Sequence, residues 1–325
     1  MTRSRLLAVA LCAWSGVARA GVHASDACVA APRRQAHELE AKCFALEHGG
    51  VERTFRLYVP PRAQGPLPLV VVLHGGGGSG AGMEWLTQGG FNRIADRDGA
   101  VVVYPDGIGK GWNDGRTDMK SKAVKEAVDD VGFLRALPRE ISSQTPLDLG
   151  RVYATGISNG GLMSYRLACD AADSFAAVAP VAANLSVELA PRCQPARPIS
   201  LAIVNGTADP IMPWRGGPVK VLWLARGNVV STPATVARWL ELDHCLALEL
   251  REHRDSVPDD GTVLERSSAS CEDGAEVALF EIQGGGHTWP SGVPYLGERL
   301  VGRVSRELDA NERIWEFLRR FQLHP

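Results

Sequence analysis

A serine with a glycine two residues before it and another two residues after it is the first candidate for chemistry in this chain. The segment reads Gly156-Ile157-Ser158-Asn159-Gly160. It lies between a β-like run, 151–155, and a run suited to a helix, 162–168. A serine at such a strand-to-helix turn has its hydroxyl exposed, and the glycines leave room for the tightly folded backbone. The segment therefore predicts Ser158 as a nucleophile for acyl transfer.

A serine nucleophile needs a base, and the base needs a carboxylate that orients it. On a sheet that carries this turn, the expected chain order is serine, acid, histidine. Asp209 follows the next-but-one apolar strand, 199–204, where parallel sheets place ligands. An aspartate before a proline is also a common turn former, and that alternative stays open. We predict Asp209 as the orienting acid.

Four histidines follow Asp209 in the chain, and one of them is well placed to act as the base: His244, His253, His287 and His324. We expect His244 in a helical segment, His253 in a polar excursion and His324 beside the last residue. His287 follows the last predicted strand and three glycines, whose flexible backbone lets an imidazole reach a serine. A histidine on a surface loop is the alternative, and the triad order favours His287 as the base.

A glycine-rich loop supplies the remaining part of an acyl-transfer site. His74 is followed by four glycines directly after the first central strand, which matches the HGGG-type loop of esterases. We expect the backbone N–H groups of Gly76 and Asn159 to bind the oxyanion. A phosphate cradle would need Lys-Ser/Thr next, whereas Ser79-Gly80-Ala81 follows. His74 is expected to support the loop through hydrogen bonds rather than act as a base.

Tryptophans are the candidates for lining an acyl pocket, with Trp112 and Trp289 ahead of Trp85 and Trp214. Ordinary packing is an equally good interpretation of each. The chain has no C-x-x-C pair, so a zinc or redox site has no support in the sequence. The predicted chemistry requires neither a metal nor a cofactor.

Apolar runs alternate with helical segments along the whole chain. The expected strands are 51–59, 67–73, 100–104, 152–155, 175–179, 199–204 and 276–282, and the expected helices are 91–97, 127–141, 161–170, 232–243 and 306–321. This alternation predicts a single α/β domain with a mostly parallel, doubly wound sheet and helices on both faces. Segments 213–228 and 257–274 are expected to be surface excursions, and Asp129 and Asp130 to serve a helix N-terminus.

The first twenty residues have the pattern of a signal peptide. Arg3 and Arg5 precede a short apolar stretch, and Ala18-Arg19-Ala20 offers a cleavage site. The stretch is too short to span a bilayer, and an uncleaved anchor is the alternative. We therefore expect a secreted or periplasmic protein with a signal peptide at 1–20, an N-terminal arm at 21–48 and a catalytic domain at 49–325.

The cysteine count agrees with export. Seven cysteines occur, and six remain after the signal peptide. An even number in an exported chain indicates disulfides, and pairing of neighbours is the simplest of about fifteen connectivities. It would join Cys28 to Cys43, Cys169 to Cys193 and Cys245 to Cys271. Free buried thiols are the alternative.

Composition narrows the class of partner. The 325 residues are 45% hydrophobic, which is ample for a packed core, and the net charge is −2. Basic residues are spread along the chain, so nothing indicates a nucleic-acid partner or, after signal cleavage, a membrane surface. The expected partner is a small or polymer-derived ester.

Several motifs in register resemble the secreted polyhydroxybutyrate depolymerase / feruloyl esterase family (carbohydrate esterase family 1, with the LpqC-like esterases). They are 73–77, 104–107, 112–114, 129–133, 156–161, 175–181, 206–209 and 285–290. The resemblance runs from about Glu47 to the C-terminus. It implies an α/β-hydrolase fold and carries a Ser-Asp-His triad onto Ser158, Asp209 and His287. It leaves the acyl group open between hydroxycinnamoyl, acetyl and 3-hydroxybutyrate. No linker or further domain follows the last predicted helix, so we expect small or soluble esters.

The sequence thus predicts a serine carboxylic-ester hydrolase that works through an acyl-enzyme on Ser158. A serine peptidase on the same fold is one alternative, because the triad types serve amides as well as esters. A non-catalytic binding protein on a hydrolase scaffold is the other.

Overall fold

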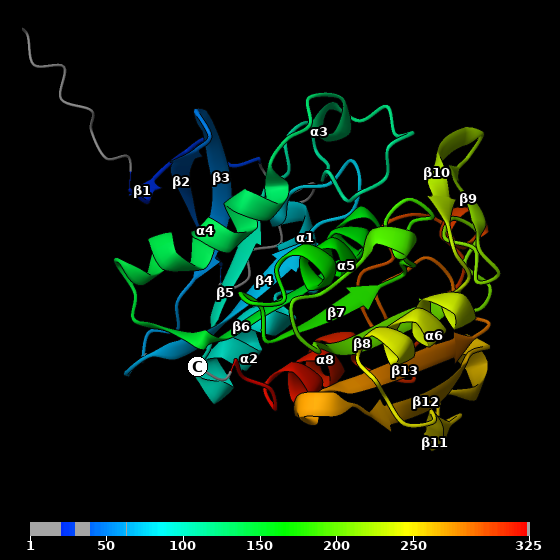
Figure 1. The fold of residues 1–325 in the computed structure, drawn as a ribbon. Coiled ribbons are helices and arrows are strands. Elements are labelled where there is room, and N and C mark those ends of the chain that lie inside the picture. Colours follow the sequence, from blue (N-terminus) through cyan, green and yellow to red (C-terminus); the bar gives the residue numbers. More distant parts are fainter. Residues whose placement is uncertain (1–20, 30–39, 63, 324–325) are drawn as a thin grey trace, which may run out of the picture.

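The computed structural model describes residues 21–29, 40–62 and 64–323. In this part of the chain, one large sheet of eleven strands runs through the molecule (Figure 1). Its strands, in spatial order, are β1 (His23–Ala24), β2 (Lys42–His48), β3 (Val51–Tyr58), β5 (Val101–Pro105), β4 (Leu67–Leu73), β6 (Leu147–Ile157), β7 (Ala177–Val181), β8 (Ser200–Gly206), β13 (Glu276–Gln283), β12 (Val263–Ser270) and β11 (Glu249–Arg254).

The centre of this sheet is parallel. Strands β5, β4, β6, β7, β8 and β13, in this spatial order, pair in parallel with one another. All residues of β4, β5, β7 and β8 are buried, as continuous apolar strands covered on both faces should be. The carboxyl ends of these strands lie along one edge, where an open α/β sheet binds its ligands.

Helices cover both faces of the sheet, and the α/β prediction is confirmed. They are α1 (Gly80–Leu86), α2 (Gly90–Asp98), α3 (Lys122–Lys125), α4 (Asp130–Ser142), α5 (Asn159–Asp170), α6 (Thr232–Leu242), α7 (Glu298–Val301) and α8 (Ala310–Leu318). Strand β4 shows the two layers. Leu69, Val71 and Leu73 join the core beneath α4, α5 and α6, whereas Val70 and Val72 join the core beneath α1, α2 and α8.

Two segments differ from the sequence-based expectation. The described residues of the predicted N-terminal arm, 21–48, contribute β1 and β2 to the sheet. Residues 257–274 contain β12, which pairs antiparallel with β13 and β11, so this segment extends the sheet. The predicted surface excursion at 213–228 agrees with the structure, since it holds β9 (Gly217–Val221) and most of β10 (Leu224–Val229), a hairpin outside the main sheet at the upper right of Figure 1. Alternating polar residues on these outer strands hide their β character.

Three disulfides confirm the predicted neighbour pairing. They join Cys28 to Cys43, Cys169 to Cys193 and Cys245 to Cys271. Such bonds are typical of proteins that fold in an oxidising compartment. The expected signal peptide, 1–20, lies outside the described residues.

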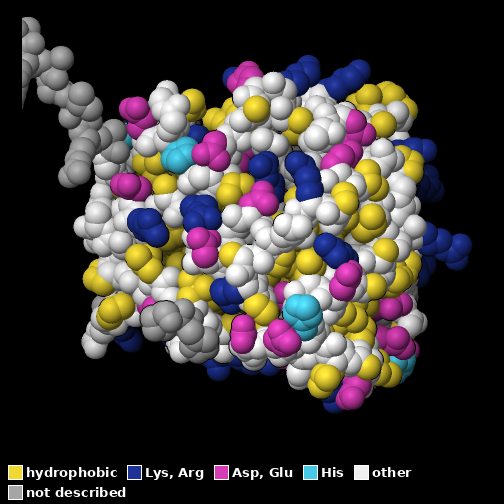
Figure 2. All heavy atoms as spheres, viewed as in Figure 1, with side chains coloured by type: hydrophobic (Ala, Val, Ile, Leu, Met, Phe, Trp, Pro, Cys, Tyr) yellow, Lys and Arg dark blue, Asp and Glu magenta, His cyan; other side chains and the backbone are white. Residues whose placement is uncertain are grey.

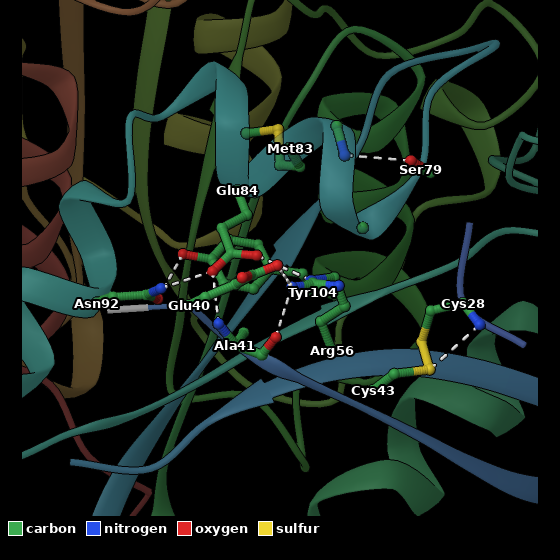
Figure 3. A network of polar contacts seen from close by, with 12 residues as sticks. Cys28, Glu40, Ala41, Cys43, Arg56, Ser79, Met83, Glu84, Asn92 and Tyr104 are labelled. Atoms are coloured by element: carbon green, nitrogen blue, oxygen red, sulfur yellow. Dashed lines mark hydrogen bonds and ion pairs between the residues drawn. A yellow bond between two sulfur atoms is a disulfide. The ribbon is translucent and has the colours of Figure 1, made fainter. Parts of the chain in front are cut away.

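A buried carboxylate ties the N-terminal strands to α1 (Figure 3). Glu84 accepts hydrogen bonds from the Ala41 N–H at 2.7 Å, from Arg56 Nε at 2.8 Å and from Asn92 Nδ2 at 2.8 Å. The Ser79 side chain caps the same helix by accepting from the Gly82 N–H. These contacts fix the start of α1, directly after the glycine-rich loop at 75–78.

The two aspartates at the start of α4 have different roles. Asp129 caps the helix, since its side chain accepts from the Gly132 N–H at 2.8 Å. Asp130 does not, because it is buried and pairs with Arg53 at 2.7 Å. Its other oxygen accepts from the Asn113 N–H at 2.8 Å, and Arg53 also lies 3.9 Å from the centre of the Phe133 ring. Asp130 therefore holds the 112–116 loop in place.

Candidate active site

Ser158 lies at a sharp turn between β6 and α5. Its backbone has φ 57° and ψ −118°, a left-handed conformation that is rare for a residue with a side chain. A Cβ atom on Gly156 would lie 2.6 Å from the Leu73 carbonyl oxygen, and Gly160 is equally confined by β4. The Ser158 N–H donates to the Val181 oxygen at 2.9 Å, which ties the turn to β7. Neighbouring strands thus hold the turn in place.

The glycine-rich loop passes directly over this turn. The N–H of Gly77 donates to the Lys110 oxygen at 2.7 Å, and that of Gly78 donates to the Gly75 oxygen at 3.0 Å. A Cβ atom on Gly76 would lie 3.8 Å from the Asn159 Cβ, so the loop and the start of α5 are adjacent. Asn159 is the first residue of α5, and its N–H therefore has no acceptor within the helix. These two residues lie close enough to offer a pair of donors to one ligand atom.

His74 is a structural support of this loop. Its Nδ1 lies 2.7 Å from the Gly75 oxygen, and its Nε2 accepts from the Gly107 N–H at 2.9 Å. Both contacts require a neutral ring with the proton on Nδ1. Burial lowers the pKa of His74 from its usual value, which favours the same neutral form. The ring also packs 4.9 Å from that of Trp112.

A buried polar network holds the side chain of Asn159. Its Oδ1 accepts from the Trp112 N–H at 2.8 Å, and its Nδ2 donates to Asp114 Oδ2 at 2.5 Å. Asp114 in turn forms a bidentate ion pair with Arg116, and both side chains are buried. Arg116 Nη1 donates to the Arg226 carbonyl oxygen on β10. One network therefore connects the start of α5, the 112–116 loop and the β9–β10 hairpin.

Asp209 and His287 are in direct contact. His287 Nδ1 lies 2.7 Å from Asp209 Oδ2, and the two side chains are 4% and 2% exposed. The other carboxylate oxygen of Asp209 accepts from the N–H groups of Ile211 and Met212, at 2.8 and 2.7 Å. An ionised carboxylate only accepts, so the proton lies on Nδ1 of His287 and Nε2 carries the free lone pair. The imidazole is oriented as a general base requires.

The loop that carries His287 is fixed by its neighbours. The His287 N–H donates to the Val301 oxygen at 2.5 Å, and the Tyr295 hydroxyl donates to the His287 oxygen at 2.7 Å. A Cβ atom on Gly286 would collide with the backbone of Val301 and Gly302, so a glycine is required there. Burial, with a contribution from the Asp209 charge, raises the pKa of Tyr295 and keeps its hydroxyl protonated.

Ser158 and His287 line one cavity of about 360 Å³. The glycine-rich loop forms part of its wall, and apolar residues form most of the rest: Met83, Trp85, Leu86, Ile157, Ile211, Val221, Tyr295 and Leu296. The described structure thus brings the nucleophile candidate, the base candidate and the loop into one apolar pocket.

Trp112 and Trp289, predicted to line the pocket, do not line this cavity. Trp112 is fully buried, and its Nε1 donates to the His74 oxygen at 2.9 Å. Trp289 packs against Phe91, and its Nε1 donates to Asn311 at 3.1 Å. A tryptophan side chain can pack in a core as well as line a ligand pocket, so the sequence alone could not separate these two roles. Trp85 is the tryptophan that reaches the cavity.

Sequence reasoning missed several members of the site. Nothing in the sequence around Asp114 and Arg116 indicated a contact with Asn159, which lies 45 residues after Asp114. Val221 belongs to the hairpin that was expected to be a surface excursion. No sequence pattern around Tyr295 indicated that it belongs to the site. In the described part of the chain, no cluster of three or more His, Cys, Asp or Glu side chains is arranged to hold a metal ion. None of the described helices is long and apolar enough to cross a bilayer.

Comparison with known proteins places the chain among esterases. It is 32% identical over 279 residues to NocK of Nocardia uniformis subsp. tsuyamanensis, whose name gives it as an esterase, covering 83% of this chain and 80% of NocK. It is 31% identical over 250 residues to feruloyl esterase B of Piromyces equi, covering 75% of this chain and 40% of that protein. It is 30% identical over 131 residues to the poly(3-hydroxybutyrate) depolymerase of Ralstonia pickettii, covering 37% of this chain and 26% of that protein. The chain spans less than half the length of the last two relatives.

Family and structural comparisons agree on the fold. Residues 49–190 match the model of the X-Pro dipeptidyl-peptidase (S15) family. A thermostable esterase superposes with a TM-score of 0.54 at 17% identity, covering 87% of this chain and 63% of that one. The acetyl xylan esterase from Aspergillus awamori superposes with a TM-score of 0.51 at 14% identity, covering 82% and 93%. At these identities the structural likeness concerns the fold alone.

Proposed function

This chain belongs to the family of esterases that includes NocK, and from that premise we propose that Ser158, Asp209 and His287 are its catalytic triad. The chain is a carboxylic ester hydrolase of the α/β-hydrolase fold. The triad assignment rests on the buried 2.7 Å contact between His287 Nδ1 and Asp209 Oδ2. His287 also lines the same cavity as Ser158.

The reaction follows from this arrangement. His287 Nε2 removes the proton of the Ser158 hydroxyl as Oγ attacks the ester carbonyl. Asp209 stabilises the imidazolium that forms. His287 then gives the proton to the leaving alcohol, and the C–O bond of the tetrahedral intermediate breaks to leave an acyl-enzyme. Water, deprotonated by the same imidazole, releases the acid and restores Ser158.

The N–H groups of Gly76 and Asn159 are proposed to bind the oxyanion. The Gly77 and Gly78 N–H groups already have acceptors, the oxygens of Lys110 and Gly75, whereas the Asn159 N–H starts a helix and has no acceptor within it. The N-terminal end of α5 also carries the positive end of the helix dipole, which favours a developing negative charge. Fixed donors of this kind typically contribute about 3–4 kcal/mol to transition-state stability.

The proposed substrate is an ester of a small apolar or aromatic acid. A cavity of about 360 Å³ with an apolar wall accepts one acyl group of modest size. Relatives named as a feruloyl esterase and a poly(3-hydroxybutyrate) depolymerase make hydroxycinnamate and 3-hydroxybutyrate esters the first compounds to test.

Replacement of Ser158 tests the assignment. Ser158→Ala should abolish hydrolysis of p-nitrophenyl acetate and methyl ferulate, and it should end labelling by a fluorophosphonate probe. Ser164→Ala is the matched control, because Ser164 is buried in α5, which starts directly after Ser158, and it donates to the Gly160 oxygen at 2.9 Å. Ester hydrolysis that survives Ser158→Ala unchanged would reject the triad. A wild-type protein inert to every ester and to the probe would favour a binding role.

A peptidase is the second candidate, favoured by the match of residues 49–190 to the X-Pro dipeptidyl-peptidase model. Turnover of an X-Pro p-nitroanilide against a p-nitrophenyl ester separates the two. The ester assignment predicts that kcat/KM for the ester exceeds that for the anilide by several orders of magnitude.

We also infer export from the cell. The three disulfides support it, because they require an oxidising compartment to form. Expression with residues 1–20 intact should yield a secreted or periplasmic product that begins at Gly21, as N-terminal sequencing would report.

A further inference from the structure

Four consecutive apolar side chains stand exposed at the end of the β9–β10 hairpin, here called the apolar tip: Val221, Leu222, Trp223 and Leu224. Their exposed fractions are 37%, 59%, 83% and 48%. Elsewhere in the described chain, large exposed hydrophobic residues do not follow one another. Figure 2 shows hydrophobic side chains gathered at the end of this hairpin. Contiguous exposed apolar side chains contribute nothing to the core and are typical of binding surfaces.

The backbone of the apolar tip carries strain. Strand β9 ends at Val221 and β10 begins at Leu224, so Leu222 and Trp223 form a two-residue turn. Leu222 has φ 56°, a conformation that such turns normally give to asparagine or glycine. A leucine there is strained and exposed to water at the same time. A leucine at this position does not stabilise the folded chain, and this favours a role for its side chain in binding.

The base of the hairpin is rigidly held. Val219 and Val229 are buried, and the Lys220 N–H donates to the Ile211 oxygen at 3.3 Å. Arg116 donates to the Arg226 carbonyl oxygen from the same buried network that holds Asn159. The apolar tip therefore keeps a fixed position relative to the oxyanion donors.

The apolar tip is continuous with the catalytic cavity. Val221 lines the cavity that contains Ser158 and His287, and Leu296, which is 48% exposed, lines it as well. A cavity of about 360 Å³ is near the lower end of the about 300–1,000 Å³ usual for ligand sites. A longer substrate must leave the cavity, and at Val221 it would meet the exposed side chains of Leu222 and Trp223.

We propose that the apolar tip binds the part of the ester substrate that extends beyond the cavity, and that this part is an apolar alkyl or aryl-alkyl chain. The inference rests on ester hydrolysis at Ser158 and adds a specificity-determining surface to it. The indole N–H of Trp223 is the single polar side-chain atom of the apolar tip. A polysaccharide would need several hydrogen-bonding groups, so the chemistry favours an apolar chain.

Chain-length dependence tests this proposal. The double variant Leu222→Ser/Trp223→Ser is compared with the wild type on p-nitrophenyl esters from acetate to decanoate and on acetate esters from methyl to decyl acetate. Loss of apolar contact should lower kcat/KM for the long members of one series by about tenfold, mainly through KM, and leave p-nitrophenyl acetate within about twofold. The series that responds identifies whether the acyl or the alcohol chain reaches the apolar tip.

Leu250→Ser provides the control, because Leu250 on β11 is exposed to the same 59% as Leu222. It should leave both series unchanged. An unaltered chain-length profile in the double variant, or an equal loss on acetate and decanoate, would overturn the proposal while leaving hydrolysis at Ser158 intact. A wild type without activity on any ester would instead refute the proposed function.

Two other occupants of the apolar tip give distinct results. Conversion of a dimer to a monomer by the double variant, with the chain-length profile unchanged, would show an interface between copies and overturn the proposal. A loss confined to feruloylated oligosaccharides, with methyl ferulate and decanoate unaffected, would show a sugar-binding surface and overturn it as well.

Discussion

His287 Nδ1 lies 2.7 Å from Asp209 Oδ2, while the second oxygen of Asp209 accepts two backbone N–H groups from residues 211 and 212. The carboxylate is therefore fixed at both ends, and its orientation determines which nitrogen of the imidazole carries the proton. This relationship can be tested by replacing Asp209 with asparagine. The amide has the same shape as the carboxylate, but its oxygen must face the two backbone N–H donors.

Asp209→Asn should invert the imidazole tautomer. The amide oxygen would accept from the two backbone N–H groups, so the amide NH₂ would face His287 Nδ1. The proton would then move to Nε2, which could no longer remove the Ser158 proton. We expect kcat at neutral pH to fall by about 10³–10⁴-fold with an unchanged melting profile. Asp173→Asn, a change at a half-exposed carboxylate paired with Arg135, should leave kcat unaltered. A loss below tenfold for Asp209→Asn would contradict the assignment.

Asn159→Ala tests the side-chain network without removing the proposed oxyanion donor. The variant keeps the backbone N–H but loses the bonds to Trp112 and Asp114. Because these bonds align the start of α5 with the loops around it, kcat should fall by about 10–100-fold while KM changes little. Asn113→Ala serves as the control, since Asn113 lies in the same 112–116 loop but its side chain donates to the Val128 oxygen instead of contacting Asn159. A change in KM alone would point to substrate contact rather than positioning.

Gly156→Ala should disrupt the turn at Ser158. The new Cβ would lie 2.6 Å from the Leu73 oxygen and 2.7 Å from the Leu73 Cβ, so β4 and β6 would have to separate. We expect a destabilisation of at least about 2 kcal/mol in urea unfolding, together with a loss of activity. Gly297→Ala is the matched change, because Gly297 has φ −65° and no atom near its Cβ position. Because Gly297 is the N-cap of the short helix α7, this change should cost less than about 1 kcal/mol. Equal stability of the two variants would refute the steric argument.

The sequence predicted the parts of this molecule whose information is local. Apolar runs such as 67–73 identify central strands, and glycines beside Ser158 identify a turn, because each depends on a few adjacent residues. The contact of Asp114 with Asn159 and the approach of Val221 to the cavity depend on which loops meet in space. Strands β12 and β11, the last two on one side of the sheet, were missed because antiparallel strands with polar outward faces lack a continuous apolar run.

The pH dependence of stability should depend on Asp243, the C-cap residue of α6. Its side chain is buried, Oδ1 accepts from the Ile199 N–H at 3.3 Å, and Oδ2 has no hydrogen-bond partner among the described residues. Burial raises its pKa to about 7. The folded pKa exceeds the unfolded value of 3.8, so the stabilisation is complete below 3.8 and is lost as pH rises through about 7.

Asp243→Asn should remove this loss, because the amide stays neutral and keeps an acceptor for the Ile199 N–H. At pH 9 the variant should therefore exceed the wild type in free energy of unfolding by on the order of 4 kcal/mol, with the difference shrinking towards pH 5. Urea titrations at pH 5, 7 and 9 measure it, with Asp255→Asn, which shows no such burial, as the reference. Parallel stability curves for wild type and Asp243→Asn across this range would show that Asp243 titrates normally.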